Sequence, residues 1–380
     1  MGFIFKAKRR LAWLVMSLFP KQQDKVVLQS YYRRGYSDSP RAIADELLRR
    51  GGYRLYWTVA GDAEAASLPE GVTPLKENSL RSIYHQCTAG FWIDNCRKWA
   101  FVRKGPKQYY IQTWHGFPLK RIEKDAGNAL PPEYIEGAIH DSQICDLFLS
   151  DSTFLTNVYH NGFWYDGPVA EYGLPRNDIL VFPPEGMYEK VAGYFSLPAG
   201  KRIALYAPTF RKDKGLDVYD VDYRRCVAAL NRRFGGDWVI LARLHPNVAS
   251  RASELDLDGV NVINASDYPD INELYVAADA MITDYSSTMF DYLITGKPAF
   301  LYVNDFADYK NDRNFYFDIE KLPFARAEDN DSLEAAILGF DESVQEEKRL
   351  GFIKEFGINE TGHSAERCAD VIEQIRRQRS

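Results

Sequence analysis

The sequence predicts an α/β protein with two doubly wound domains that face a central cleft. Three observations support this fold class. The chain has 380 residues, which is enough for two hydrophobic cores. Short apolar runs alternate with helical patterns, as is typical of parallel sheets that carry helices on both faces. This alternation stops at a Gly- and Pro-rich stretch, 171–186, and then begins again.

The elements of the first half follow from apolar runs and turn residues. The run at 25–31 predicts the first strand, and the segment 37–52 predicts a helix. That helix has Pro40 in its first turn and Gly51 as its stop, which are favourable positions for both residue types. Further strands are expected at 53–61, 91–94, 108–114 and 146–152.

The second half repeats this pattern after the Gly- and Pro-rich stretch. Ligands of open α/β sheets bind at the carboxyl ends of the strands, so residues that follow strands are the first candidates for function. The second half is expected to contain strands at 202–208, 238–246, 260–264, 280–287 and 298–303, with helices at 223–233, 271–277 and 288–293.

Charge and cysteine content exclude several classes of protein. The formal net charge is −6, so general binding to nucleic acid has no support and no nucleic-acid partner is expected. The five cysteines are odd in number and widely spaced, and none forms a C-x-x-C motif. This usage argues against a disulfide framework and a zinc site, and favours reduced thiols in a cytosolic protein.

The first segment, 1–23, is basic and partly apolar. Its apolar run at 11–19 is shorter than the roughly 20 residues that a membrane-spanning helix needs. A helical wheel places Lys6, Arg9 and Arg10 mostly away from the apolar face, which predicts a helix lying on an anionic membrane surface. The alternative is an ordinary first helix that packs on the protein. The apolar face would consist of Ile4, Ala7, Leu11, Leu14, Val15 and Leu18.

Three hydroxyl residues, Ser286–Thr288, stand where a strand is expected to end and a helix to begin. The first amides of a helix lack intrahelical partners, and the helix dipole favours an anion there. The pattern therefore predicts a phosphate site. The alternative is plain helix capping, for which one hydroxyl would suffice.

His115 follows the expected strand at 108–114 and precedes Gly116, which favours a turn. A histidine at a strand end can act as a general base, because its ordinary pKa lies near neutrality. The alternative is a structural histidine. The basic, aromatic stretch 97–108 is expected either to contact an anionic polymer or lipid headgroup or to form a solvated face.

Two strand ends of the second half carry further candidates. Arg243 and His245 are two residues apart on an extended segment and would point in the same direction, which suits a phosphate. Thr209 and Arg211 follow another strand. The alternatives are a buried arginine beside a turn histidine, and a solvated basic loop.

Longer motifs then connect these residues to a known family. In order, the chain contains GYSDSPRAIADEL, QTWHGFPLK, LYAPTFR, RLHPN, MITDYSSTMFDYLITGKPAFLYVND and GHSAERCADVIEQI. This series resembles the CDP-glycerol glycerophosphotransferase family, the teichoic acid primases and polymerases. The resemblance begins near residue 30 and covers most of the remaining chain.

The resemblance implies a GT-B-like fold and a phosphotransferase reaction. A polyol phosphate, most often glycerol phosphate, would pass from a CDP-activated donor to a hydroxyl of a lipid-linked glycan or polymer, releasing CMP without a metal or cofactor. His115 would be the base, and Arg243 and His245 would bind the donor phosphates and support the leaving group. The other implied residues are Thr209, Arg211, Ser286, Ser287 and Thr288 on the donor side, and Gly35, Tyr36, Ser37 and Gly116 on the acceptor side.

Three features depart from the family pattern. Phe117 stands where a small or hydroxyl residue is more common, Glu123 stands where Gly is common, and 321–326 replaces a Pro-Gly turn. The polyol, CDP-glycerol or CDP-ribitol, and the acceptor stay open for this reason. The sequence also leaves open whether the enzyme is a primase or a polymerase, whether its product is wall polymer or capsule, and which oligomeric state it has.

The expected organisation has three parts and one location. Residues 1–23 form the membrane-contact segment, 24–175 the acceptor-side domain and 176–380 the donor domain, whose last helix is a candidate for packing back on the first domain. The protein is expected to be peripheral on the cytoplasmic face of a bacterial membrane. Two alternatives are kept: a GT-B glycosyltransferase that uses a nucleotide sugar, and a non-catalytic scaffold that binds nucleotide or polymer.

Overall fold

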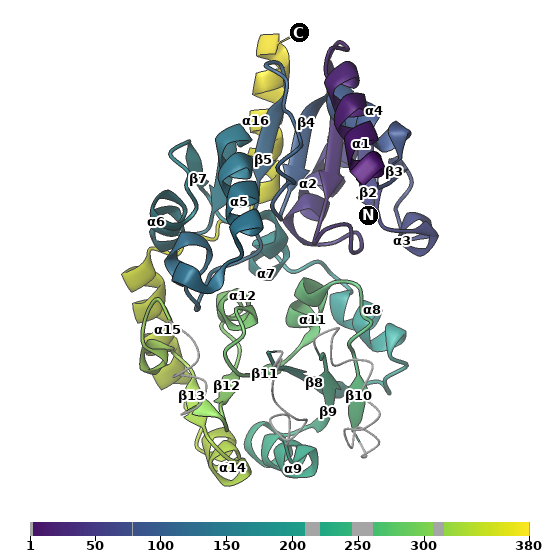
Figure 1. The fold of residues 1–380 in the computed structure, drawn as a ribbon. Coiled ribbons are helices and arrows are strands. Elements are labelled where there is room, and N and C mark those ends of the chain that lie inside the picture. The colour runs from purple at the N-terminus through teal and green to yellow at the C-terminus, as the bar shows by residue number, and fades with distance from the viewer. Residues whose placement is uncertain (1–2, 78, 210–220, 245–260, 307–314, 380) are drawn as a thin grey trace. The chain divides into compact units, whose positions relative to one another are not determined.

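The computed structural model describes residues 3–77, 79–209, 221–244, 261–306 and 315–379, and Figure 1 shows its helices and strands. Its two sheets are both parallel, and each lies in its own compact part of the chain. Within the described ranges, no helix combines the length and the apolar character needed to cross a bilayer.

The chain divides into two units that exchange segments. Unit 1 comprises Met1–His115, Ile122–Asp178 and Ile358–Ser380, and unit 2 comprises Gly116–Arg121 and Ile179–Gly357. The C-terminal segment belongs to unit 1, in line with the expectation that the last helix of the second domain is a candidate for packing back on the first. The chain leaves unit 1 directly after His115 and returns six residues later.

Unit 1 contains a seven-stranded sheet in the order β3-β2-β1-β4-β5-β6-β7. Its central strands contain buried apolar runs, such as Val26–Leu28 in β1, because both faces of a parallel sheet are covered by helices. In β1, Val26 and Leu28 belong to the core cluster that also contains side chains of α2 (Asp38–Arg50) and α16 (Ser364–Arg379). The strands are β1 (Gln22–Gln29), β2 (Arg54–Val59), β3 (Val72–Lys76), β4 (Ala89–Asp94), β5 (Tyr109–Gln112), β6 (Leu147–Ser150) and β7 (Val169–Glu171).

The opposite face of this sheet carries α1 (Phe3–Met16) and α4 (Leu80–Thr88). Trp92 of β4 points to this face: its ring meets Trp13 edge-on at 6.0 Å, and its Nε1 donates to the Gln86 carbonyl at 2.8 Å. Figure 1 shows α1, in purple, beside the bluer α4. The remaining helices of unit 1 are α3 (Asp62–Ala66), η1 (Glu123–Ala129), α5 (Pro132–Ile144), α6 (Thr153–Gly162) and η2 (Pro175–Asn177).

Unit 2 contains a six-stranded sheet in the order β10-β9-β8-β11-β12-β13. One face packs on α9 (Tyr223–Phe234) and α14 (Asn330–Leu338) through a shared apolar core. Its strands are β8 (Lys201–Ala207), β9 (Asp237–Ala242), β10 (Val262–Asn264), β11 (Ala280–Thr283), β12 (Ala299–Tyr302) and β13 (Ala325–Ala327). In the described part of unit 2, the other helices are α8 (Met187–Tyr194), α11 (Ile271–Ala277), α12 (Thr288–Ile294), η5 (Ile319–Lys321) and α15 (Glu342–Phe356), while α7 (Asp178–Val181) joins the two units.

Candidate active site

Each sheet reverses its winding once, and the candidate residues follow strands at these points or directly beside them. The order of unit 1 reverses between β1 and β4, and that of unit 2 between β8 and β11. Ligands of open α/β sheets bind at such a switch point, outside the carboxyl ends of the strands. Thr209 follows β8 and Ser286 follows β11, whereas His115 follows β5, the strand beside β4.

The ring of His115 is held in one tautomer. Its Nδ1 atom lies 2.7 Å from the backbone oxygen of Asn95, the residue after β4. Because a carbonyl oxygen only accepts hydrogen bonds, the ring proton is on Nδ1 and the Nε2 lone pair is the basic site. Burial lowers the pKa of His115 below its ordinary value of 6.5, despite the opposing Asn95 hydrogen bond. The neutral, basic form therefore predominates at neutral pH.

The backbone around His115 is strained. Trp114 has φ 51° and Gly116 has φ 131°, and the left-handed region is costly for any residue but glycine. The Trp114 ring stacks on the imidazole with a centroid distance of 4.1 Å. Among the described residues, nine that are not glycine have positive φ, and six of them lie after β1 or β5: Tyr31, Tyr32, Arg33, Asp38, Trp114 and Glu123. Strain of this kind gathers at functional sites.

A buried ion pair fixes the peptide of His115. Arg176 Nη1 donates to the His115 carbonyl at 2.8 Å and to Asp38 Oδ2 at 2.9 Å. Tyr31 donates to the same carboxylate at 2.6 Å. Burial opposes the charge of Asp38, but Arg176 and Tyr31 hold the pKa of this carboxyl below its usual value. Asp38 therefore stays ionised and holds the Arg176 guanidinium, which in turn fixes the His115 peptide.

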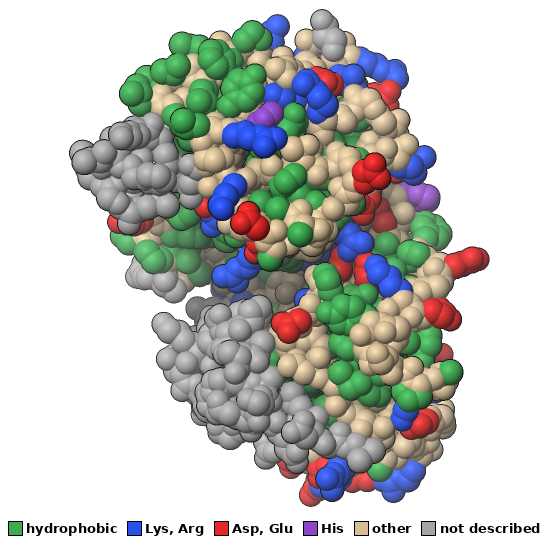
Figure 2. Space-filling model, turned by 90° about the vertical axis from the view of Figure 1, so that its right-hand side faces the viewer, with side chains coloured by type: hydrophobic (Ala, Val, Ile, Leu, Met, Phe, Trp, Pro, Cys, Tyr) green, Lys and Arg blue, Asp and Glu red, His purple; other side chains and the backbone are tan. Residues whose placement is uncertain are grey.

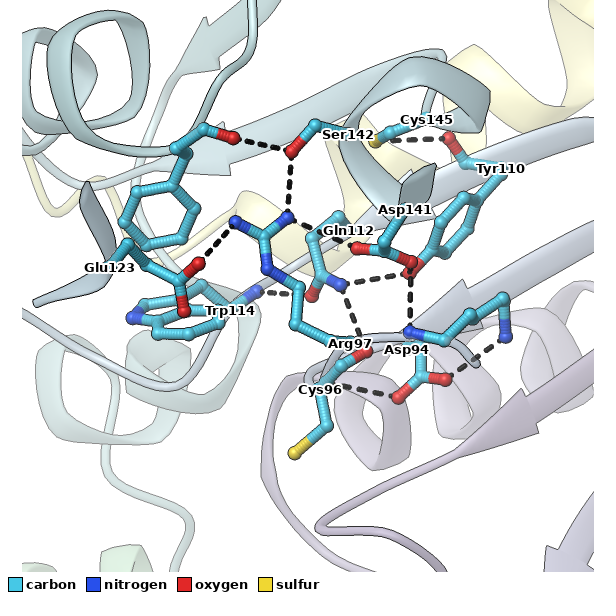
Figure 3. Close-up of polar contacts among 12 residues, drawn as sticks. Asp94, Cys96, Arg97, Tyr110, Gln112, Trp114, Glu123, Asp141, Ser142 and Cys145 are labelled. Atoms are coloured by element: carbon cyan, nitrogen blue, oxygen red, sulfur yellow. Dashed lines mark hydrogen bonds and ion pairs between the residues drawn. The ribbon is translucent and has the colours of Figure 1, made fainter. Parts of the chain in front are cut away.

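A second buried network supports Trp114, and Figure 3 shows its contacts. The Arg97 guanidinium donates to Glu123 at 2.9 Å and to Asp141 at 3.1 Å. It also lies 5.7 Å from the centroid of the Trp114 ring. The Trp114 amide donates to the side chain of Gln112 at 3.0 Å. These contacts fix the residue that stacks on His115.

Part of the basic stretch 97–108 is paired with acidic side chains of unit 1. Arg97 is buried in ion pairs, and Lys98 donates to the buried carboxylate of Asp94 at 3.0 Å. Lys104 pairs with Asp146. These three cations are paired within unit 1, whereas Arg103 and Lys107 are exposed, so both expectations for the stretch stay predictions.

The expected acceptor-side residues lie in the turn before α2. Gly35 has φ 78°, and its carbonyl accepts from Ser30 and from Trp57 Nε1. Tyr36 packs its ring on Trp57 at 4.6 Å. Ser37 is the buried N-cap residue of α2, but its side chain makes no capping bond. These residues shape the loop after β1, and Gly116 continues the strained turn after His115.

In unit 2, Asp284 joins the two strand ends at the switch point. The amide of Thr209 donates to both oxygens of Asp284, at 2.9 Å and 3.0 Å, and the Thr209 hydroxyl donates at 2.6 Å. The hydroxyl proton of Thr209 is therefore directed at Asp284. These bonds of Thr209 fix the start of the segment after β8. Arg211, the other candidate in this segment, lies outside the described residues.

The three hydroxyl residues lie at the start of α12. Ser287 is the N-cap residue and is exposed, but its side chain makes no capping bond. The Ser286 oxygen accepts from the Thr288 amide at 3.4 Å. The Thr288 hydroxyl is buried without a hydrogen-bond partner among the described residues. Plain capping by Ser287 therefore does not explain this run of hydroxyls.

Arg243 follows β9, and carbonyl oxygens hold its side chain. Its Nη1 donates to Tyr268 at 2.6 Å and to Ala265 at 3.3 Å. These bonds position the cation beside the end of β9. His245, the other half of the predicted pair, lies outside the described residues.

Phe117 and Glu123, which depart from the family pattern, both have structural partners. Phe117 packs in unit 2 against Phe290 of α12 at 4.6 Å and against Phe356 at 5.8 Å. Glu123 has φ 54°, a conformation that suits glycine, and forms the buried pair with Arg97. Each departure thus adds a packing or ionic contact close to His115 in the chain.

Sequence reasoning missed three residues that organise these sites. Asn95 acts through its backbone carbonyl, so its side-chain type gives no signal. Arg97 stands among other cations, and no local pattern shows that it is buried. Asp284 is part of the MITDYSST motif and follows β11, so its position at a strand end could have identified it.

Among the described residues, no group of three or more His, Cys, Asp or Glu side chains is arranged to hold a metal ion. The expectation that the reaction needs no metal stays a prediction.

Comparison with known proteins gives a match along nearly the whole chain. The sequence model of the CDP-Glycerol:Poly(glycerophosphate) glycerophosphotransferase family matches residues 11–374. A teichoic acid glycerol-phosphate transferase of Staphylococcus aureus (strain NCTC 8325 / PS 47) is 32% identical over 94% of this chain and 95% of its own. A teichoic acid poly(glycerol phosphate) polymerase of Staphylococcus epidermidis is 30% identical over 91% of this chain, but this match spans only 50% of that longer protein.

Solved structures of the wall teichoic acid polymerase TagF share this fold. One, of a His-to-Ala variant, superposes with a TM-score of 0.86 at 27% identity and covers 99% of this chain and 96% of that one. Another, of a His-to-Asn variant soaked with CDPG, has a TM-score of 0.86 at 28% identity and covers 99% and 95% of the two chains. The expected GT-B-like fold is thereby confirmed.

Proposed function

Because this chain belongs to the CDP-glycerol:poly(glycerophosphate) glycerophosphotransferase family, we propose that it transfers glycerol phosphate from CDP-glycerol to a hydroxyl of a membrane-linked acceptor. The similarity to a glycerol-phosphate transferase along both chains supports the donor. The reaction belongs to the synthesis of teichoic acid or a related cell-surface polymer. The observation that carries the chemistry is the fixed Nδ1–H tautomer of His115 in a strained loop.

The transfer follows from the chemistry of the donor and the acceptor. The acceptor oxygen attacks the phosphorus that bears glycerol, and the bond from this phosphorus to the oxygen of CMP breaks. His115 Nε2 takes the proton of the attacking hydroxyl, and CMP leaves with the electron pair of the broken bond. The low pKa of His115 keeps Nε2 unprotonated at neutral pH and ready for this step.

Unit 2 is proposed to bind the donor. Ser286, Ser287 and the amides at the start of α12 would bind the pyrophosphate, with Arg243 supplying positive charge. Arg211 and His245 keep their predicted donor-side roles. Thr209 and Asp284 fix the two strand ends beside this site. We further propose that the transfer needs no metal ion, so that activity survives EDTA.

The protein is proposed to be peripheral, on the cytoplasmic face of the membrane that carries the acceptor. The apolar side chains of Leu11, Leu14, Val15 and Leu18 are exposed on α1 and just beyond it, and the adjoining sequence is basic. An exposed apolar face beside cations favours binding to anionic lipid.

Release of CMP by the purified chain tests this proposal. CDP-glycerol and CDP-ribitol are offered separately, each with a lipid-linked disaccharide and with the same disaccharide after priming with glycerol phosphate. We expect acceptor-dependent CMP from CDP-glycerol, and the length of the product separates a primase from a polymerase. His115→Ala should lower kcat by about 10²–10⁴-fold, the usual contribution of a general base.

The control variant is His363→Ala, which removes an exposed histidine of unit 1 and should leave the rate unchanged. A loss of less than about tenfold in His115→Ala would contradict its role as general base. Turnover of a nucleotide sugar instead of a CDP-polyol would indicate the glycosyltransferase. Binding of CDP-glycerol without any turnover would indicate the scaffold.

A further inference from the structure

We propose that the surface around the mouth of a small cavity of unit 1, at the switch point between β1 and β4, binds the neutral saccharide of the acceptor. The cavity itself, about 40 Å³, is too small to enclose a pyranose ring, so the ring would lie on the exposed side chains at its mouth. The proposal rests on the proposed transfer function and gives its acceptor a binding site. The cavity is lined in part by Gln29, Tyr32, Arg33, Glu77, Lys98 and Trp99.

The position of the cavity follows from the sheet order. Gln29 is the last residue of β1, and Tyr32 and Arg33 follow it. Lys98 and Trp99 follow β4, the neighbouring strand on the other side of the switch point. The cavity therefore lies at the carboxyl ends of the strands, where doubly wound sheets bind their ligands. None of these residues was singled out from the sequence as an acceptor-binding residue.

The charges around the cavity are paired. Arg33 forms an ion pair with Glu77, and Lys98 Nζ lies 3.0 Å from Asp94 Oδ2. Arg97, which also lines the cavity, is held by two carboxylates, as Figure 3 shows. Cations paired in this way offer little net positive charge to a phosphate but can still exchange hydrogen bonds with hydroxyl groups. The lining therefore suits a neutral polyhydroxylated ligand better than an anion.

Two exposed aromatic side chains add an apolar surface to this polar lining. Trp99 is 57% exposed and Tyr32 is 41% exposed, which is unusual for rings of this size. A pyranose ring presents apolar C–H groups on its faces and hydroxyls at its edge. A ring that packs on Trp99 would place these hydroxyls near Gln29 and the paired charges, which matches the mixture of surfaces in ligand sites.

The cavity also adjoins the apolar face proposed to meet the membrane. Trp13 of α1 lines it, and Leu11, Leu14 and Leu18 are exposed on the same helix and just beyond it. Figure 2 shows hydrophobic side chains gathered at the upper left of this view, with Lys and Arg side chains nearby. A lipid-linked saccharide joins an apolar chain to a polar head. The apolar chain would lie along the exposed leucines of α1, and the polar head would lie at the mouth of the cavity.

Trp99→Ala tests the proposal in the full chain. The kinetic readout is the KM for a neutral disaccharide on a short alkyl chain, with CDP-glycerol as donor. We expect the KM to rise roughly three- to tenfold, since an aromatic contact contributes about 0.5–1.5 kcal/mol. Trp99→Phe keeps an aromatic surface and should restore most of the affinity. The KM for CDP-glycerol should not change in either variant.

A binding readout separates this site from the transfer activity. The same disaccharide is titrated into His115→Ala and into the double variant His115→Ala, Trp99→Ala. Weaker binding in the double variant than in His115→Ala supports the saccharide site. This holds even if the parent chain releases no CMP, because failure of CMP release contradicts only the proposed transfer function. Acceptor-dependent CMP release with unchanged saccharide binding in both Trp99 variants overturns the site and leaves the transfer function intact.

Two further controls address other uses of Trp99. Leu350→Ala removes a side chain that is 52% exposed on α15 of unit 2 and should not change binding of the disaccharide. If Trp99→Ala weakens binding to anionic vesicles but not to the disaccharide, Trp99 belongs to the membrane surface and the proposal is wrong. Tighter, Trp99-dependent binding of the glycerol-phosphate-primed disaccharide would also overturn the assignment to a neutral saccharide.

Discussion

At the scale of single residues, the properties of His115 come from its neighbours. The Asn95 carbonyl sets its tautomer, burial lowers its pKa, and the Trp114 ring restricts its orientation. An isolated histidine would be partly protonated near neutral pH and would exchange between tautomers. The surrounding residues thus convert a common side chain into a base that is fixed in position and neutral.

This account predicts the acidic limb of the pH profile. A general base acts only when it is deprotonated, so the rate falls as pH drops through its pKa. Because burial lowers the pKa of His115, the acidic limb of kcat/KM should be centred below pH 6.5, and kcat/KM should fall about tenfold per pH unit below the lowered pKa. The measurement is kcat/KM for the acceptor from pH 4.5 to 9. An acidic limb centred above 6.5 would contradict it.

Glu123 provides a residue-scale test of backbone strain. Glu123→Ala and Glu123→Gly both remove the ion pair with Arg97, and each should lower the free energy of unfolding by roughly 3–5 kcal/mol. At φ 54°, alanine retains a backbone cost of about 1–2 kcal/mol that glycine avoids. The glycine variant should therefore be more stable than the alanine variant in denaturant unfolding. Equal stability, or the reverse order, would show that this strain is small.

At the scale of elements, the central strand β1 contains an uncommon buried cation. Lys25 is 1% exposed, donates to the Thr88 hydroxyl at 2.7 Å, and lies 5.0 Å from the centroid of the Tyr84 ring. Burial lowers the pKa of Lys25 to about 8 from its ordinary 10.5. The folded chain thus binds this proton less tightly than the unfolded chain does.

Lys25→Met should stabilise the protein at pH 7 by roughly 1–3 kcal/mol, because methionine fills the site without a buried charge. In the parent, stability should rise between pH 8 and 10.5, where the folded chain has lost the proton and the unfolded chain still holds it. The advantage of Lys25→Met should therefore shrink over this range. Chemical unfolding at several pH values measures it, with the exposed Lys76→Met as control. If Lys25→Met instead destabilises the protein at pH 7, the contacts of Lys25 with Thr88 and Tyr84 compensate the cost of burying its charge.

At the scale of the whole molecule, a basic, apolar N-terminal segment is joined to an acidic protein. The chain has a net charge of −6, yet its first ten residues contain Lys6, Lys8, Arg9 and Arg10. The proposed association with an anionic membrane would then depend on this segment, since the net charge of the molecule opposes it.

Leu14→Glu and Leu18→Glu should each weaken binding to anionic vesicles by about tenfold or more, because burial of a leucine contributes roughly 1.5–3 kcal/mol. The two side chains are 65% and 81% exposed, so the unfolding temperature should not change. Vesicle flotation measures the binding. Leu350→Glu, at a 52% exposed leucine of α15, is the matched control and should bind like the parent. Equal binding of all variants would indicate that α1 is an ordinary surface helix.

The sequence by itself determined the two α/β halves, because apolar runs and turn residues are local signals. The predicted strands at 25–31 and 202–208 correspond to β1 and β8, and the predicted helix at 223–233 to α9. β3, β7 and β13 were not predicted, since they are short strands whose pairing depends on a neighbour. The motifs also placed His115 and Ser286 at the ends of strands.

Only the tertiary structure decided how these residues are held. The bond from His115 to a backbone carbonyl and the burial of Arg97 beside Glu123 join segments that are distant in sequence. The same is true of the exchange of 116–121 into unit 2, where Phe117 meets Phe290. Residue types report local propensity and polarity, whereas the tautomer, the pKa and the partner of a side chain depend on atoms that only folding brings near.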